Sequence, residues 1–267
     1  MRYVFVSDIH GRMDRLKVAL ESVGFDMQKD TLVSLGDPFD RGKENIEVLK
    51  FLMSCPHRVI VWGNHDLRLY DLLRGKDFIS SYDRDNGTLA TFREFTGDYT
   101  LVAQTNRNMK PVNFYKKDIE VLWHQYCKEA VFGLEFSDLI AVHAWVPCSV
   151  WDKYRILLME DWRNATWSDW EEATWAHVEN IIMCEAFPDK RMIIGHWHAW
   201  RLAIKFGLEE RKFVPQGSTH VYIKTDPFYL NDQLIAIDGC SNYEYGGQVN
   251  AWVYESDEDP IFFSPKE

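Results

Sequence analysis

Residues 3–11 read YVFVSDIHG, a short strand-like run that ends in an aspartate, a histidine and a glycine. Tyr3–Val6 is rich in β-branched and aromatic residues, which favours a strand. Apolar residues then recur at helical spacing from Met13 to Val23. The stretch therefore predicts a strand, a loop that carries polar side chains, and a helix.

The same order repeats over the first 66 residues. Thr31–Leu35 and Arg58–Trp62 are further strand candidates, and a helix is expected from Glu44 to about Met53. Strands separated by about 30 residues with a helix between them are typical of βαβ units, in which neighbouring strands are parallel. The fold class is therefore α/β.

The middle of the chain has a different pattern. Residues 75–136 are mostly helical and polar, and we interpret them as a helical cap inserted into a single domain that covers residues 1–267. Strands are expected again at Leu139–Val142 and Arg191–Ile194, with a tryptophan-rich helical stretch from about Trp151 to Phe187 between them.

Two apolar runs follow near the C-terminal end of the sequence. Leu234–Ile237 and Val249–Tyr254 both have strand character. We expect these two runs to pair with each other as closing antiparallel strands.

The composition indicates a folded protein and narrows its partners. The chain has 267 residues, 46% of them apolar, and its 16 Phe, 12 Tyr and 11 Trp are too many for a disordered chain. Thirty basic against 41 acidic residues give a net charge of −11, which argues against nucleic acid and against a membrane surface as partners. The five cysteines include no CxxC pair, so we expect reduced thiols and a cytoplasmic location.

Polar residues follow each of the five expected core strands. Because ligands of α/β sheets bind outside the carboxyl ends of the strands, we expect these segments to converge on one site. The segments are SDIHG (7–11), GDPFDRG (36–42), WGNHD (62–66), HAW (143–145) and GHWH (195–198).

The residue types in these segments suit metal ions. Asp8 and His10 are two residues apart in an extended turn, so both side chains can face one ion. A mixture of Asp, Asn and His is typical of sites for manganese, iron or zinc, whereas an all-carboxylate set would suit magnesium or calcium. We therefore expect a centre with two metal ions.

Taken together, the five segments resemble the calcineurin-like metallophosphoesterase superfamily. GDPFDRG is similar to the phosphoprotein phosphatase branch, including its bacterial and phage enzymes, and residues 235–252, IAIDGCSNYEYGGQVNAW, resemble the closing strands of that branch. The resemblance implies a four-layer α/β/β/α sandwich of two mixed sheets, with the active site at their top edge.

The resemblance also implies metal ligands. Two divalent transition-metal ions are expected, manganese first, with iron, zinc or nickel as alternatives. His198 is expected to be a further ligand of the first ion, because residues two apart in GHWH project to the same side. The expected set is Asp8, His10 and His198 on the first ion, Asp37 between both, and Asn64, His143 and His196 on the second.

The resemblance also implies catalytic roles for three further residues. Arg41 would hold the phosphate oxygens, His65 would protonate the leaving oxygen, and Asp40 would orient His65. Arginine often precedes the glycine of the third segment in this branch, but the residue here is Trp62. Arg163, or Arg155 as the alternative, is therefore expected to supply that phosphate contact.

These expectations define a metal-dependent phosphoesterase that hydrolyses its substrate by in-line attack of a metal-bridging hydroxide. The first interpretation is a phosphomonoesterase of the serine/threonine protein phosphatase type, with a phosphoprotein as substrate. The alternative is a nucleotide hydrolase such as a symmetrical dinucleoside tetraphosphatase. A non-catalytic scaffold with the same fold is a third hypothesis, disfavoured because every metal-ligand and catalytic position is filled.

Overall fold

The computed structural model describes residues 1–99, 112–207, 212–213 and 222–265. In chain order its elements are β1 (Arg2–Val6), α1 (Met13–Ser22), β2 (Thr31–Leu35), α2 (Asn45–Ser54), β3 (Arg58–Val61), α3 (Asn64–Leu73), α4 (Ser81–Asp85), α5 (Thr88–Thr96), α6 (Lys117–Glu129), β4 (Gly133–Glu135), β5 (Leu139–Val142), β6 (Cys148–Asp152), β7 (Arg155–Leu158), the 3-10 helix η1 (Trp162–Asn164), α7 (Trp167–Ala173), α8 (Val178–Met183), β8 (Arg191–Ile194), α9 (Ala199–Lys205), β9 (Lys212–Phe213), β10 (Tyr222–Ile223), β11 (Phe228–Leu230), β12 (Leu234–Ala236), β13 (Ala251–Glu255) and β14 (Ile261–Phe263).

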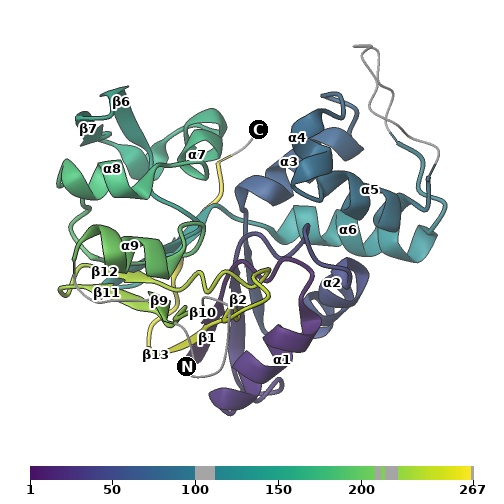
Figure 1. Ribbon diagram of the computed structural model, residues 1–267, viewed down its shortest axis with the longest axis horizontal. Coiled ribbons are helices and arrows are strands. Elements are labelled where there is room, and N and C mark those ends of the chain that lie inside the picture. Colours follow the sequence, from purple (N-terminus) through teal and green to yellow (C-terminus); the bar gives the residue numbers. More distant parts are fainter. Residues whose placement is uncertain (100–111, 208–211, 214–221, 266–267) are drawn as a thin grey trace.

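Two mixed sheets form the centre of the molecule. The first has the order β13-β1-β2-β3, with β1, β2 and β3 parallel and β13 antiparallel to β1. The second has the order β11-β12-β8-β5-β4-β14, in which β12, β8 and β5 are parallel. Helices α1–α6 gather on one side of the molecule and α7–α9 on the other (Figure 1).

Alternation along the strands separates the layers. Tyr3 and Phe5 of β1 pack into a core with residues of the second sheet such as Ile193, whereas Val4 and Val6 belong to the core shared with the helices. Successive side chains of a strand point to opposite faces, so one strand serves both cores. The four-layer α/β/β/α sandwich is confirmed.

The expected closing hairpin is wrong. Residues 234–236 form β12, which lies parallel to β8 in the second sheet, whereas residues 251–255 form β13, antiparallel to β1 in the first sheet. β12 lies between β11 and β8 in the second sheet and β13 is the edge strand of the first, so the chain crosses from one sheet to the other between them. This crossing carries Asp238 and Cys240 past the carboxyl end of β12.

The expected helical stretch from Trp151 to Phe187 is only partly right. Its first part pairs as the antiparallel hairpin β6–β7, in which the Asp152 carboxylate accepts a hydrogen bond from the Tyr154 N–H at 2.8 Å. Such an aspartate turn favours a hairpin over a helix. Helices α7 and α8 follow it.

The range 75–136 contains α4, α5 and α6, while residues 100–111 lie outside the described residues. Helices α5 and α6 pack against α2, so they extend the helical layer of the first sheet. At the end of the range, β4 belongs to the second sheet, so the helical part ends before Gly133. Among the described residues, no helix is long and apolar enough to cross a bilayer.

The core between the two sheets is expected to contribute strongly to the free energy of unfolding. Phe5 is fully buried there, and we expect Phe5→Ala to lower the free energy of unfolding by about 3–5 kcal/mol through lost burial and a residual cavity. Phe262 of β14 is 47% exposed, and Phe262→Ala is the matched control, expected to change stability by about 0.5 kcal/mol or less. Urea denaturation measures both, and equal losses would contradict the assigned layers.

Candidate metal centre

The five polar segments meet at one edge of the two sheets. Backbone hydrogen bonds join four of them in pairs: the His10 N–H donates to the Asp37 carbonyl at 3.1 Å, and the Gly195 N–H donates to the His143 carbonyl at 2.8 Å. Each segment follows the carboxyl end of a parallel strand, so the parallel pairing of the strands aligns the loops. The predicted convergence is present.

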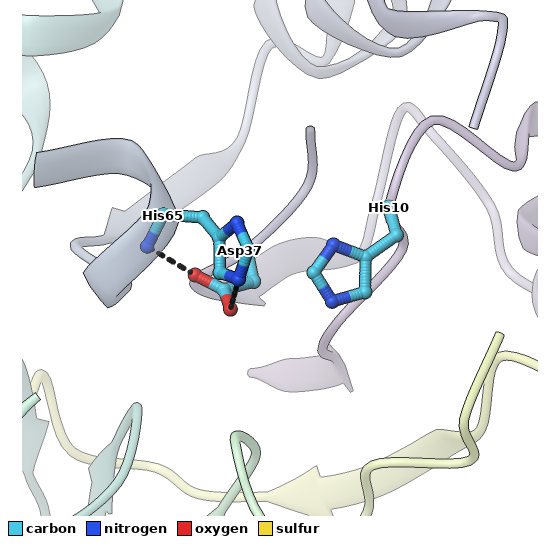
Figure 2. A group of neighbouring side chains, drawn as sticks. All are labelled: His10, Asp37 and His65. Carbon is cyan, nitrogen blue, oxygen red and sulfur yellow. Dashed lines mark hydrogen bonds and ion pairs between the residues drawn. The ribbon is translucent and has the colours of Figure 1, made fainter. Parts of the chain in front are cut away.

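Asp37 lies at the centre of the cluster. Its carboxylate belongs to two groups of ligand-type atoms, each with all members within 4.8 Å of one another, one with His10 and His65 and the other with His143 and His196. The Asp37 Oδ1 accepts a hydrogen bond from the His65 N–H at 3.0 Å, and its Oδ2 lies 3.6 Å from His143 Nε2. Figure 2 shows this carboxylate against His65, with the His10 ring facing it. One carboxylate thus faces both groups.

Backbone carbonyls fix the orientation of two imidazoles. His10 Nδ1 lies 2.7 Å from the Phe39 carbonyl oxygen, and His143 Nδ1 lies 2.7 Å from that of Leu35. A carbonyl oxygen can only accept, so Nδ1 carries the hydrogen in both rings and Nε2 keeps a lone pair. Both Nε2 atoms point into the cluster, as metal-ligating histidines do.

Electron-rich atoms also face one another around Asn64. The Asn64 Oδ1 lies 3.0 Å from His143 Nε2 and 3.0 Å from His196 Nδ1. Because His143 Nε2 has no hydrogen when Nδ1 donates to Leu35, an oxygen and a nitrogen lone pair meet without a proton between them. A cation placed among these atoms removes the repulsion, so the donor set fits a metal ion.

The carboxylate of Asp8 adds negative charge beside the same cluster. It accepts hydrogen bonds from the Ser7 hydroxyl and, at 2.8 Å, from the His196 N–H. Burial raises the pKa of Asp8, and the carboxylates of Asp238 and Asp37 raise it further. A cation would offset this crowding of buried carboxylates.

A glycine brings Asp8 and the last segment together. A Cβ on Gly195 would lie 1.7 Å from the Ser7 Oγ and 2.5 Å from the Asp8 Oδ2. Such distances are far inside van der Waals contact, so a side chain at this position would displace Asp8.

The site imidazoles fall into two electrostatic classes. Burial is the main cause that lowers the pKa of His10, with help from Arg41, and burial also lowers the pKa of His196 to about 3. Burial would lower the pKa of His65 as well, but Asp37 and a hydrogen bond to Asp40 outweigh it and raise that pKa. Neutral imidazoles suit metal ligation, whereas a proton-carrying imidazole suits acid catalysis.

His65 is held in place through Asp40. His65 Nδ1 lies 2.7 Å from the Asp40 Oδ2, and Asp40 is fully buried. The hydroxyls of Thr88 and Thr91 donate to the two Asp40 oxygens at 2.5 Å and 2.6 Å. Both threonines come from α5, so this helix fixes the position of the His65 ring through Asp40.

Arg41 occupies the open side of the cluster. Its Nη1 lies 2.6 Å from His10 Nε2, and its Nη2 lies 2.9 Å from His65 Nε2. Beside it is a cavity of about 490 Å³, which we call the cationic cavity. Its lining residues are Arg41, Arg84, Asp85, Asn86, Gly87, His198 and Asn242.

Several residues of the polar segments have strained backbone conformations. The left-handed region of φ, which side chains other than glycine rarely adopt, is occupied by residues of every segment except WGNHD and HAW. Strain of this kind clusters at functional sites, where the surrounding structure enforces it. The residues are Asp8, His10, Asp37, Asp40, Arg41 and His196, with φ of 50°, 48°, 52°, 71°, 63° and 57°.

One expected site residue, Arg163, lies elsewhere. Arg163 donates to Glu135 and Asp189, each at 2.8 Å, and Asp189 precedes β8 whereas His196 follows it. Arg163 is therefore at the opposite end of the strand, and the structure corrects the expectation that it contacts phosphate. Trp62 is buried and packs against Tyr126, so it offers no phosphate contact either.

His198 lies beside the cluster with a partner of its own. Its Nδ1 is 2.7 Å from the Asp238 Oδ2, and the two residues form a separate ligand-type group with Cys240. The role of His198 as a ligand of the first ion stays a prediction. Asp238 was missed from the sequence, although it follows β12 just as the other polar residues follow their strands.

Comparison with known proteins adds relatives that share part of the sequence. A symmetrical bis(5'-nucleosyl)-tetraphosphatase of Buchnera aphidicola subsp. Acyrthosiphon pisum (strain Tuc7) is 44% identical over 70 residues, which cover 26% of each chain. One of Aliivibrio salmonicida (strain LFI1238) is 38% identical over 85 residues, 32% of this chain and 31% of the relative. The chain thus spans between a quarter and a third of the length of these curated relatives.

A solved structure matches the fold, and a family model matches most of the sequence. A crystal structure of a proposed diadenosine tetraphosphatase has a TM-score of 0.50 and 16% identity, covering 99% of this chain and 94% of that one, which concerns the fold alone. Residues 1–200 match the family model of calcineurin-like phosphoesterases. This match covers most of the 267 residues and confirms the resemblance in the motifs: the chain belongs to the calcineurin-like phosphoesterase family.

Proposed function

We propose that this protein is a metal-dependent hydrolase of dinucleoside polyphosphates. The main observation in support of metal-dependent hydrolysis is the position of Asp37, whose carboxylate belongs to two groups of ligand-type atoms. The nucleotide substrate is supported by the relatives named symmetrical bis(5'-nucleosyl)-tetraphosphatase. This support favours the nucleotide alternative over the protein phosphatase interpretation.

Residues on both sides of Asp37 would hold two divalent ions. Imidazole nitrogens and an amide oxygen beside the carboxylates suit manganese, and also iron, zinc or nickel. The chemistry supplied by such ions when bound is polarisation of a phosphoryl oxygen and activation of water. The proposed ligands are Asp8, His10 and Asp37 on one side and Asp37, Asn64, His143 and His196 on the other.

Arg41 would bind the phosphoryl group under attack. Its guanidinium lies between His10 and His65, and its planar fork of donors matches two phosphate oxygens. The cationic cavity continues from Arg41 with the side chains of Arg84 and Asn242. A monoester needs one phosphate site, so these further donors support a substrate with a longer phosphate chain.

His65 would deliver the proton to the leaving oxygen. Its Nδ1 hydrogen is fixed by Asp40, which leaves Nε2 as the atom that exchanges the proton. Thr88 and Thr91 hold Asp40 in turn, so the imidazole cannot rotate freely. A scaffold without activity would not need this buried acid–base pair.

The substrate class is tested by a panel assay with manganese present. We expect diadenosine tetraphosphate to be cleaved to ADP as its one nucleotide product, with kcat/KM at least about tenfold above that for a phosphoserine peptide. Chelation by EDTA is the control and should abolish the reaction. Phosphate release from the peptide with the dinucleotide left intact would restore the protein phosphatase interpretation.

The proton donor is tested by His65→Asn. We expect turnover of phenyl phosphate to fall by about 10²- to 10⁴-fold, because phenolate is a poor leaving group that needs a proton. The loss on 4-nitrophenyl phosphate should be smaller, since its leaving group departs as an anion. His57→Asn, at an exposed loop residue, is the matched control, and equal losses on the two esters would show that His65 is not the acid.

A further inference from the structure

A second cavity, of about 460 Å³, lies between the hairpin β6–β7 and helices α7 and α8. We call it the apolar cavity, because Val146, Ile156, Ala173 and Ile181 of its wall are buried hydrophobic residues. None of the metal-ligand or catalytic positions proposed above lines it. An apolar cavity of this size fits a flat organic ring system better than a phosphate.

One chain of aromatic contacts connects the apolar cavity to the metal centre. His177 lines the cavity, and its ring centroid lies 5.7 Å from that of Trp197. The Trp197 ring in turn lies 5.9 Å from His196, so the two separations place His177 within about 12 Å of the metal-ligand ring. This reach is comparable to the length of a nucleoside with its first phosphates.

A second connection runs through α4. Trp175 lines the apolar cavity, is 41% exposed, and lies 6.1 Å from the ring of Tyr82, which is 43% exposed. Tyr82 and Arg84 are on the same short helix, and Arg84 lines the cationic cavity. Helix α4 therefore lines the cationic cavity through Arg84 and contacts, through Tyr82, a tryptophan that lines the apolar cavity.

The charges around the apolar cavity exclude phosphate as its occupant. Its lining carries the three carboxylates of Asp152, Asp169 and Glu172 against one described basic side chain, Lys153. Carboxylates repel phosphate oxygens but accept hydrogen bonds from amino groups. The cavity is thus complementary to a ring that bears an amino group, and the cationic cavity to a phosphate chain.

From this arrangement we infer that the apolar cavity binds an amino-bearing nucleobase of the substrate, with Trp175 as the surface on which the base stacks. The inference rests on the proposed nucleotide hydrolase and assigns residues that recognise the nucleoside. Base stacking on aromatic side chains tolerates different ring systems, so the carboxylates supply the preference for the amino group.

Calorimetric titration of the full chain with adenosine, which carries no phosphate, measures binding to the apolar cavity alone. We expect the unaltered protein to bind adenosine more tightly than inosine, which lacks the exocyclic amino group. Trp175→Ala should weaken adenosine binding by about 5- to 150-fold. The matched control is Trp151→Ala, at a 59% exposed tryptophan that does not line the cavity, which should leave binding unchanged.

A fold check by circular dichroism accompanies both variants. No adenosine binding by the unaltered protein, equal binding of inosine, or equal binding by the folded Trp175→Ala variant would overturn the inference. The proposed hydrolase is tested separately, because adenosine binding does not require cleavage. If adenosine binds as expected while diadenosine tetraphosphate stays intact, the cavity assignment stands and the hydrolase proposal fails.

Discussion

Electron-rich atoms crowd around the buried Asp37 carboxylate, and their mutual repulsion is the unfavourable interaction that the site has to offset. His10 and His143 donate through Nδ1 to backbone carbonyls, so their other nitrogens present lone pairs to this carboxylate. The Asn64 oxygen faces His143 and His196 in the same way. Such a group of atoms favours positive charge among them, and the parallel strands of both sheets deliver the loops that carry these atoms to one edge.

Holding the loops in this position requires a rigid support. Asp8 and His10 follow β1 in left-handed conformations, which cost about 1 kcal/mol or more each, and β1 is paired on both sides and buried between two cores. Helix α5 adds to the support, because it holds Asp40 through two threonine hydroxyls. The proposed metal ligands thus follow strands of the sandwich, whereas the position of the proposed proton donor depends on α5.

Features that depend on a local sequence pattern could be predicted from the sequence alone. Each parallel strand and the polar segment after it were predictable, because a buried strand leaves an apolar run and the loop beyond it leaves Asp, His and Gly. The partners of β12 and β13 were not, since an apolar run alone does not show which sheet a strand joins. Thr88, Thr91 and the pairing of Arg163 with Glu135 depend on contacts between distant segments, for which a single sequence carries no signal.

We propose that Asp37 bridges two metal ions, and anomalous X-ray diffraction from crystals grown with manganese can locate both ions. Two manganese peaks are expected about 3.5–4 Å apart, both in contact with the Asp37 carboxylate. His10 should contact one peak, and Asn64, His143 and His196 the other. A single peak, or manganese bound at His198 and Asp238 with Asp37 uncoordinated, would contradict it.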